Sequence, residues 1–291
     1  MSGGAAAWSD LGDGIRVRRS AAFAMNSVLL LDPQHTVIVD PGVLPSELDD
    51  LAREVTAARP KATTLFFTHA HWDHVLGRPW WPRAKTIAHD RFAAEAKRDR
   101  DTILREAEAI ATKHGERWEK GFTPFKPDQE VSGLHFMRLD PWRLVFRDAP
   151  GHSASQLSCH LPDRRLLIAA DMLSDIEPPI LNGPCAVYRK TLDALMNLAE
   201  NDAIETIVPG HGSIARDGAD CIVRLLADAL YLTDLETRAN LAADQGLSFE
   251  DAQESLAAMD YTGKRSKTYP TESFHRDNMR FAFDGVMAER R

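Results

Sequence analysis

Residues 68–74 read Thr-His-Ala-His-Trp-Asp-His and place three imidazoles and one carboxylate within six positions. The apolar run at 65–67 before them predicts a short buried strand, so these side chains would lie on the loop that leaves a strand end. In extended backbone, residues two apart point the same way, so His69 and His71 could bind one ion while a turn carries the pair at 73 and 74 toward another. We therefore interpret this stretch as the start of two adjacent metal sites.

Three further candidate ligands each follow an apolar run that predicts a strand: His152, Asp171 and His211. The two histidines also directly follow a Pro-Gly pair, which is typical of a turn at a strand end. Because several strand ends can meet at one edge of a sheet, these residues could complete a pair of metal sites.

The motif His-x-His-x-Asp-His, a later His, a later Asp and a final Gly-His-Gly resemble the metallo-β-lactamase-fold superfamily over about residues 15–212. The resemblance implies an α/β fold, a four-layer αββα sandwich, here with a helical insert and a helical C-terminal extension. It implies that metal 1 is bound by His69, His71 and His152. Metal 2 would be bound by Asp73, His74 and His211, and Asp171 would bridge the two. It also implies that Asp40, after a predicted strand, orients the metal loop. An ordinary Asp-Pro-Gly turn is an equally good interpretation of Asp40.

The donor types favour a catalytic metal. Three neutral imidazoles with an open fourth position are typical of catalytic zinc, whereas structural zinc is usually closed by cysteines. The cysteines, Cys159, Cys185 and Cys221, form no Cys-x-x-Cys pair. We expect two divalent ions. Zinc is the expected metal, and iron and manganese are the alternatives. Such a pair, with two carboxylates and a bridging hydroxide, leaves a positive centre, and metal-bound water can have a pKa of about 7.

Length and composition indicate an ordinary globular enzyme. The chain has 291 residues, 44% of them hydrophobic, enough for one α/β domain with an appended segment or for two small domains. We expect a catalytic domain at 1–216, with a helical insert at about 90–120, and a helical extension at 217–291 packed on the same domain. The insert and the extension could serve only for packing or form a subunit surface, or they could line the substrate pocket. The sequence favours neither alternative.

The net charge and the absence of targeting signals limit the classes of binding partner that we expect. The net charge is −8 and no block of Lys and Arg interrupts it, which disfavours nucleic acid. The sequence shows no secretory pattern and no apolar run that could span a bilayer, so we expect a cytoplasmic protein without a membrane partner. Three scattered cysteines fit a reducing compartment. The expected partner is a small-molecule substrate, and homo- or hetero-oligomers stay open.

Periodicity predicts alternating elements along the chain. Strands are expected at 28–31, 36–39, 65–67, 86–88, 135–139, 144–147, 156–160, 166–169 and 206–208. Helices are expected at 45–59, 91–120 (one or two), 188–199, 217–240, 248–259 and 271–289. In the tail, the apolar face is expected to contain Leu225, Leu226, Ala229 and Leu232.

The reaction class follows from the site, but the substrate does not. We expect hydrolysis of a small-molecule ester, thioester, lactone or similar activated bond by the bridging hydroxide. Class B1 lactamases carry Cys where this chain has Asp171, and N-acyl homoserine lactonases carry Tyr where it has Ser174. Lactonase and nitroaryl ether hydrolase activities remain alternatives on the same site. A mononuclear iron persulfide dioxygenase is the alternative from another class.

Roles for individual residues vary in how well the sequence supports them. Asp73 is the candidate to orient or deprotonate the attacking water as well as to bind metal 2. Ser174, Tyr269 and His275 are candidates for contact with substrate or with the metal ligands. For His275, simple packing in the last predicted helix is the favoured interpretation.

Overall fold

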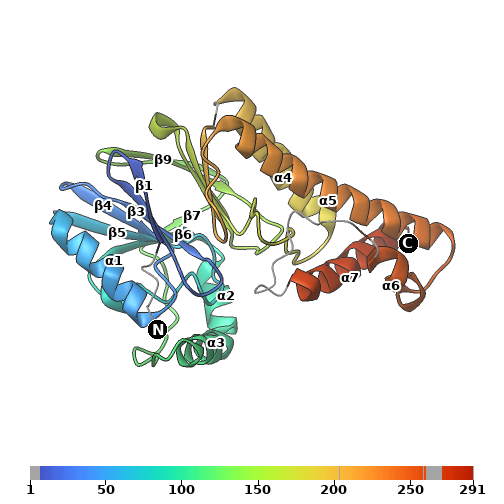
Figure 1. Ribbon diagram of the computed structural model, residues 1–291, viewed down its shortest axis with the longest axis horizontal. Helices are drawn as coiled ribbons and strands as arrows, with labels where there is room; N and C mark the ends of the chain where they lie inside the picture. Colours follow the sequence, from blue (N-terminus) through green and yellow to red (C-terminus); the bar gives the residue numbers. More distant parts are fainter. Residues whose placement is uncertain (1–6, 203, 258, 260–270, 291) are drawn as a thin grey trace. The chain divides into compact units, whose positions relative to one another are not determined.

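The computed structural model describes residues 7–202, 204–257, 259 and 271–290. The chain forms two compact units. Unit 1 contains residues 1–148 and 155–163, and unit 2 contains residues 149–154 and 164–291. Two β-sheets and flanking helices make up the described chain, which confirms the expected mixed α/β fold class (Figure 1). The expected division at residue 216 stays a prediction.

A seven-stranded sheet, with its strands in sequence order, is the framework of unit 1. Its strands are β1 (Ala7–Gly12), β2 (Ile15–Arg19), β3 (Asn26–Leu30), β4 (His35–Val39), β5 (Ala62–Phe66), β6 (Lys85–His89) and β7 (Gln129–Val131). The first four pair antiparallel and β4 to β7 pair parallel. Because β4 and β5 run parallel and Val39 pairs with Phe66, the loops that follow both strands leave the sheet side by side.

Three helices accompany this sheet. They are α1 (Pro45–Ala58), α2 (Phe92–Arg98) and α3 (Arg100–Lys113). Leu48, Leu51 and Val55 of α1 point inward and join the core that covers one face of the sheet. The expected insert is therefore helical, but it ends at Lys113 and residues 116–127 carry no helix.

Unit 1 also holds an antiparallel meander, β8 (Leu134–Leu139), β9 (Trp142–Asp148) and β10 (Leu157–Leu161). It faces the seven-stranded sheet, because Phe66 of β5 and Phe146 of β9 meet edge to face with ring centroids 4.9 Å apart. The indole of Trp142 also donates a hydrogen bond to the carbonyl of His35 on β4. Two sheets thus pack across a shared apolar layer within this unit.

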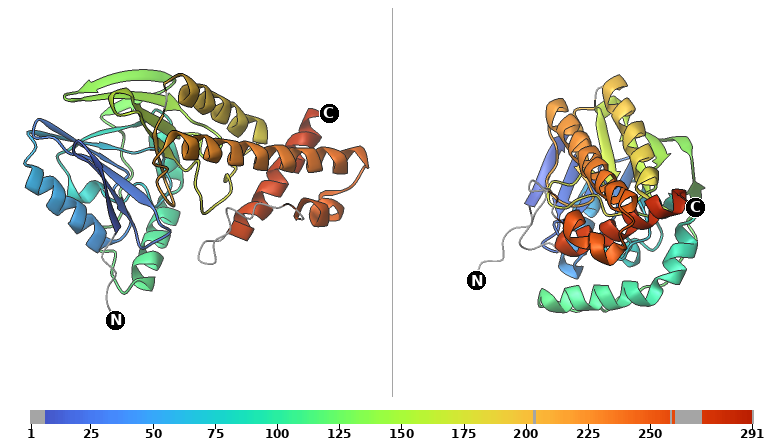
Figure 2. Two further views of the ribbon diagram at one scale, coloured as in Figure 1. Left: turned by 45° about the horizontal axis from the view of Figure 1, so that its top comes forward. Right: turned by 90° about the vertical axis from the view of Figure 1, so that its right-hand side faces the viewer.

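Unit 2 begins with two parallel strands, β11 (Leu166–Ala170) and β12 (Thr206–Pro209), joined through α4 (Cys185–Asn201). Three more helices follow: α5 (Gly218–Asp244), α6 (Phe249–Ala257) and α7 (Thr271–Glu289). Helix α5 packs along α4 and against α7 (Figure 2). One hydrophobic core joins all of these elements, with Leu167, Leu195, Leu235 and Phe283 among its members. No helix in the described part of the chain is long and apolar enough to cross a membrane.

Some sequence expectations were wrong. Strands β1 and β2 were not predicted, although Asp13-Gly14 between them is a common hairpin turn and both residues have positive φ. The short strand β7 was also missed. Leu226, expected on the apolar face of α5, is 47% exposed, whereas Leu225 and Leu232 are fully buried. Successive helical residues are about 100° apart, so the buried face centres on the Leu225 side and leaves Leu226 outside it.

Candidate metal centre

The ligand loop of unit 1 begins directly after β5. His69 and His74 are fully buried, Asp73 is nearly so, and His71 is partly exposed. The ring centroid of His69 lies 4.5 Å from that of His71 and 4.2 Å from that of His74. His69 and His71 each offer a ligand atom, and these atoms lie within 4.8 Å of one another, as do those of Asp73 and His74. The loop therefore gathers the imidazoles that the sequence motif predicted would converge.

Asp40, in the loop after β4, holds this segment. Its carboxylate accepts hydrogen bonds from the Thr68 amide at 2.7 Å, the Thr68 hydroxyl at 2.6 Å and His74 Nδ1 at 2.9 Å. Since the Thr68 hydroxyl donates to Asp40, its oxygen accepts from His69 Nδ1 at 3.0 Å. Both rings thus carry their proton on Nδ1 and keep Nε2 as the atom that could bind a metal. The structure places Asp40 where an orienting carboxylate would lie.

A glycine lets the Asp40 loop approach the ligand loop. A Cβ atom at Gly42 would lie 2.3 Å from the carbonyl oxygen of Asp73, far inside van der Waals contact. The hydroxyl of Ser27 on β3 donates to the Asp40 carbonyl at 2.7 Å and fixes the same turn. Close backbone approach therefore explains why the Asp-Pro-Gly sequence ends in glycine at this position.

The candidate ligands of unit 2 come from separate loops. His152 lies in residues 149–154, Asp171 follows β11 and His211 follows β12. Asp171 Oδ2 lies 3.2 Å from His152 Nε2 and 3.4 Å from His211 Nε2, and all three side chains are at most 7% exposed. Because β11 and β12 run parallel and pair at Ala170, their ends bring Asp171 and His211 together. One carboxylate thus lies between two imidazoles.

Close packing of backbone around Asp171 and His152 leaves little freedom. A Cβ atom at Gly210 would lie 2.0 Å from Asp171 Oδ1, and one at Gly151 would lie 2.7 Å from Tyr188 of α4. His152 Nδ1 is 3.1 Å from the carbonyl oxygen of Ile180, which can only accept, so Nδ1 donates this hydrogen bond and Nε2 faces Asp171. The ring orientation is therefore set in the same way as in unit 1.

Helix α5 fixes the loops after both parallel strands. Arg224 donates from Nη1 to the Ser213 carbonyl at 2.6 Å, and Asp228 accepts from the Leu173 amide at 3.1 Å. Asp175 accepts from the Ser213 amide at 2.8 Å and connects the two loops. Both α5 side chains are at most 8% exposed. The sequence analysis missed them, and their only signal was a charged pair, four residues apart, on an otherwise apolar face.

The donor set in each unit fits a divalent metal. The loop of unit 1 and the three loops of unit 2 each supply His and Asp side chains, the donor types of catalytic zinc, and all of them except His71 are buried. The cysteines do not compete for this role. Burial raises the pKa of the Cys185 thiol to about 12, that of Cys221 to about 11 and that of Cys159 well above its ordinary value. All three are buried free thiols.

The remaining predicted residues have varied surroundings. Ser174 is buried, and its hydroxyl accepts from the Ile176 amide at 3.2 Å. His275 of α7 is 4% exposed, and its Nδ1 lies 2.8 Å from the hydroxyl of Tyr231 on α5. These contacts describe packing inside unit 2. Tyr269 lies outside the described residues.

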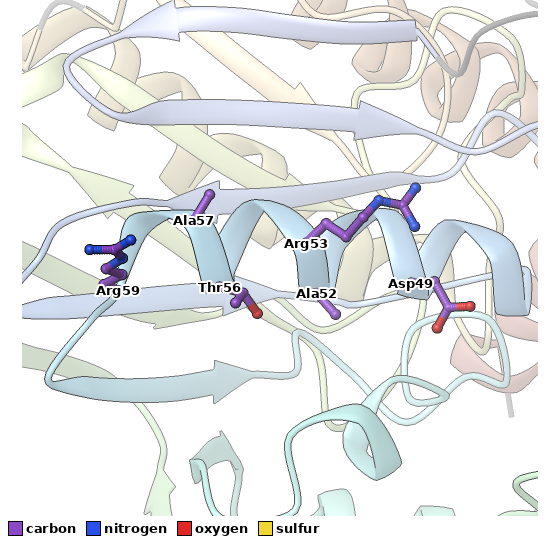
Figure 3. Close-up of a pocket in the computed structure, with 6 residues that line it drawn as sticks. All are labelled: Asp49, Ala52, Arg53, Thr56, Ala57 and Arg59. Carbon is purple, nitrogen blue, oxygen red and sulfur yellow. The ribbon is translucent and has the colours of Figure 1, made fainter.

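A surface groove on α1 is a separate feature. Figure 3 shows its lining: Asp49, Ala52, Arg53, Thr56, Ala57 and Arg59. These side chains include a carboxylate and two guanidinium groups but no His or Cys. The groove therefore lacks the imidazole donors that mark the candidate metal centre.

Comparison with known proteins gives consistent likenesses. A family model, that of the metallo-beta-lactamase superfamily, matches residues 22–211. The protein called acyl-coenzyme A thioesterase MBLAC2, in Homo sapiens and in Bos taurus, is 26% identical to this chain over 245 residues. That match covers 76% of this chain and 86% of each relative.

Solved structures share the fold. The stereoselective inverting sec-alkylsulfatase Pisa1 from Pseudomonas sp. has a TM-score of 0.75 at 16% identity. The metallo-beta-lactamase family protein TTHA1429 from Thermus thermophilus has a TM-score of 0.67 at 18% identity. Each match covers 96% of this chain, with 50% of the Pisa1 chain and 95% of the TTHA1429 chain. This chain thus spans half the length of Pisa1, and identities this low concern the fold alone.

Proposed function

This chain belongs to the metallo-beta-lactamase superfamily. On that basis we propose that it is a hydrolase that cleaves an acyl thioester with two divalent metal ions, for which zinc is the preferred candidate. The observation that carries the proposal is the buried donor set of each unit, in which hydrogen bonds at Nδ1 orient the rings of His69, His74 and His152. Residues held in this way are suited to bind a metal without further rearrangement.

The proposed ligand roles follow the family motif. One ion is assigned to His69, His71 and His152, the second to Asp73, His74 and His211, and Asp171 is shared. Support for a shared Asp171 comes from its position between two imidazole Nε2 atoms in unit 2. Two bound divalent ions would supply an activated water at neutral pH and a positive charge opposite the developing oxyanion.

The protein's own groups have distinct tasks in this reaction. Asp73, 6% exposed, is the carboxylate that orients the attacking water, and its Oδ1 lies 3.7 Å from His74 Nε2. Asp40 and the Ile180 carbonyl hold the imidazoles in the tautomer that binds metal. Since the imidazoles in these hydrogen bonds are buried, the geometry is fixed before substrate arrives.

A thioester is the proposed substrate class because of the likeness to a protein called an acyl-coenzyme A thioesterase over 76% of the chain. A thioester carbonyl also suits a positive centre, and its thiolate is a good leaving group, so hydroxide attack needs little further assistance. The substrate is expected to be a small molecule, because the chain carries a net charge of −8 without a basic cluster for nucleic acid.

The test combines metal analysis with a substrate panel. Purified protein should contain close to two divalent ions per chain, chelation should abolish activity, and zinc should restore it. The panel contains acyl thioesters, aryl esters, acyl homoserine lactones and nitroaryl ethers, and acyl thioesters should give the highest kcat/KM. Preference for a lactone would correct the substrate class alone. One iron per chain with oxygen consumed in turnover would replace the hydrolase by the dioxygenase alternative.

A further inference from the structure

A backbone carbonyl contributes to the orientation of the His152 ring. Its Nδ1 donates to the oxygen of Ile180 at 3.1 Å, and its Nε2 faces Asp171 Oδ2 at 3.2 Å. That carbonyl lies in a segment without helix or strand, residues 171–184. Pro178 and Pro179 precede Ile180 and have no amide hydrogen, so this stretch has few donors with which to fix its own backbone.

Asn278 of α7 supplies contacts on both sides of Ile180. Its Nδ2 donates to the Pro179 carbonyl at 2.5 Å, and its Oδ1 accepts from the Leu181 amide at 2.8 Å. The Leu181 amide and the Ile180 carbonyl belong to one peptide plane. The Leu181 contact therefore fixes the direction in which the Ile180 oxygen points.

The amide of Asn278 is held in a single orientation. It is fully buried, and its Nδ2 also donates to the Tyr231 hydroxyl at 2.9 Å. That hydroxyl also forms a hydrogen bond of 2.8 Å with His275 Nδ1. A flipped amide would place its NH₂ group against the Leu181 amide and its oxygen against the Pro179 carbonyl, which hydrogen bonding forbids. Helices α5 and α7 thus lock this side chain.

We propose that Asn278 is a positioning residue, which sets His152 for metal binding through the Ile180–Leu181 peptide. The inference rests on the proposed function, since it gives His152 a metal to bind. Hydrogen bonds in a chain strengthen one another, so donation from Leu181 to Asn278 also makes the Ile180 oxygen a better acceptor for His152. It follows that part of the metal affinity originates in a helix far along the chain from every ligand.

The experiment measures zinc binding and the His152 tautomer, not turnover. Asn278→Leu keeps a similar branched shape and removes all three hydrogen bonds of the amide. We expect zinc affinity, measured by competition with a chromophoric chelator, to fall about tenfold. That is the lower end of what partners in direct contact with a ligand contribute. In the metal-free protein, ¹⁵N NMR should show Nδ1 of His152 protonated in the wild type and a mixture of tautomers in the variant.

Two additional variants make the outcome decisive. Leu256 of α6 is a buried apolar residue of the same core, and its side chain makes no hydrogen bond to the Pro179–Leu181 segment. Leu256→Ala creates a cavity there, so it should lower the melting temperature and leave zinc affinity unchanged. Asn278→Asp, which retains an acceptor for Leu181, serves if Asn278→Leu is insoluble, and it should weaken zinc binding less than tenfold but measurably. Unchanged zinc affinity and tautomer in the Asn278 variants would overturn the inference. A wild type that binds no zinc would instead overturn the proposed function.

Discussion

Unit 1 supplies its candidate metal ligands from one loop, residues 69–74, whereas unit 2 takes His152, Asp171 and His211 from three separate segments. In unit 1 a single carboxylate, Asp40, orients the loop through three hydrogen bonds. In unit 2 the same task is divided among side chains from α5 and α7. In this protein, the ligands that are close in sequence share the support of Asp40, and those that are far apart are supported by helices.

This difference determines how substitutions should disturb the ligand geometry of each unit. The unit 1 loop should be sensitive to a change of one residue, because three of its hydrogen bonds are made to the carboxylate of Asp40. The unit 2 ligands lie between elements that share one hydrophobic core, so a change in any helix could displace them in part. The following predictions test this contrast, in order of decreasing effect.

Asp73→Asn should change activity most. Removal of a positioned catalytic carboxylate commonly lowers the rate about 10²- to 10⁴-fold, before any loss of metal is counted. The measurement is kcat/KM on the best thioester, with circular dichroism to show an intact fold. Asp163→Asn, at an exposed ion pair with Arg143, is the matched control and should be silent. Equal activity of wild type and Asp73→Asn would refute the assigned role.

Gly210→Ala tests the packing of unit 2. The new Cβ would lie 2.0 Å from Asp171 Oδ1 and must push that carboxylate aside. A displacement of about 1 Å at a reacting centre can cost about 10²-fold in rate. The control is Gly218→Ala, whose Cβ would meet only the Ile204 carbonyl at an ordinary 3.5 Å. A Gly210→Ala enzyme with normal kcat and normal metal content would show that Asp171 does not need this position.

Asp40→Asn tests the single support of unit 1. The amide cannot accept all three hydrogen bonds, so we expect zinc affinity to fall about 10- to 100-fold. Asp128 is a matched control, because its Oδ2 accepts from the Thr86 amide and hydroxyl, each at 2.9 Å. Asp128→Asn should leave zinc affinity unchanged. If both variants lowered affinity equally, Asp40 would have no special role.

The Asp128 control also carries a pH prediction. Hydrogen bonds from Thr86 hold the pKa of Asp128 below its ordinary value. A depressed folded-state pKa contributes stability above the unfolded-state pKa of about 3.9, and that stability is lost as the pH falls through the folded-state pKa. The difference in melting temperature between wild type and Asp128→Asn should therefore shrink as the pH is lowered below about 4. A difference that grew instead would contradict this assignment.

Alkylation of the cysteines should have the smallest effect on activity. Iodoacetamide at about pH 8 should leave activity unchanged, because all three thiols are buried and burial raises the pKa of Cys185 to about 12 and of Cys221 to about 11. Mass spectrometry of the native protein should find no adduct. Rapid inactivation with one adduct per chain would place a reactive thiol at the site.

The candidate ligands of both units, and the elements that carry them, could be predicted from the amino-acid sequence alone. The motif at 69–74 is local, and the predicted strands before His152, Asp171 and His211 exist as β9, β11 and β12. The hairpin of β3 and β4, helix α1 and the three tail helices were also predicted, because these show clear periodicity or capping residues. Strands β1, β2 and β7 were missed, and they are short strands near the edges of the sheet.

What holds the ligands in place depends instead on tertiary packing. Asn278 contacts the segment of Pro179 across 99 positions, and Asp228 contacts Leu173 across 55. No periodicity or motif links residues so far apart, since such pairs arise only when helices pack on a common core. Metal ligands are recognisable from sequence because their chemistry restricts the residue type. Their supports are not, because any side chain with a suitable donor or acceptor can serve wherever the fold brings it close.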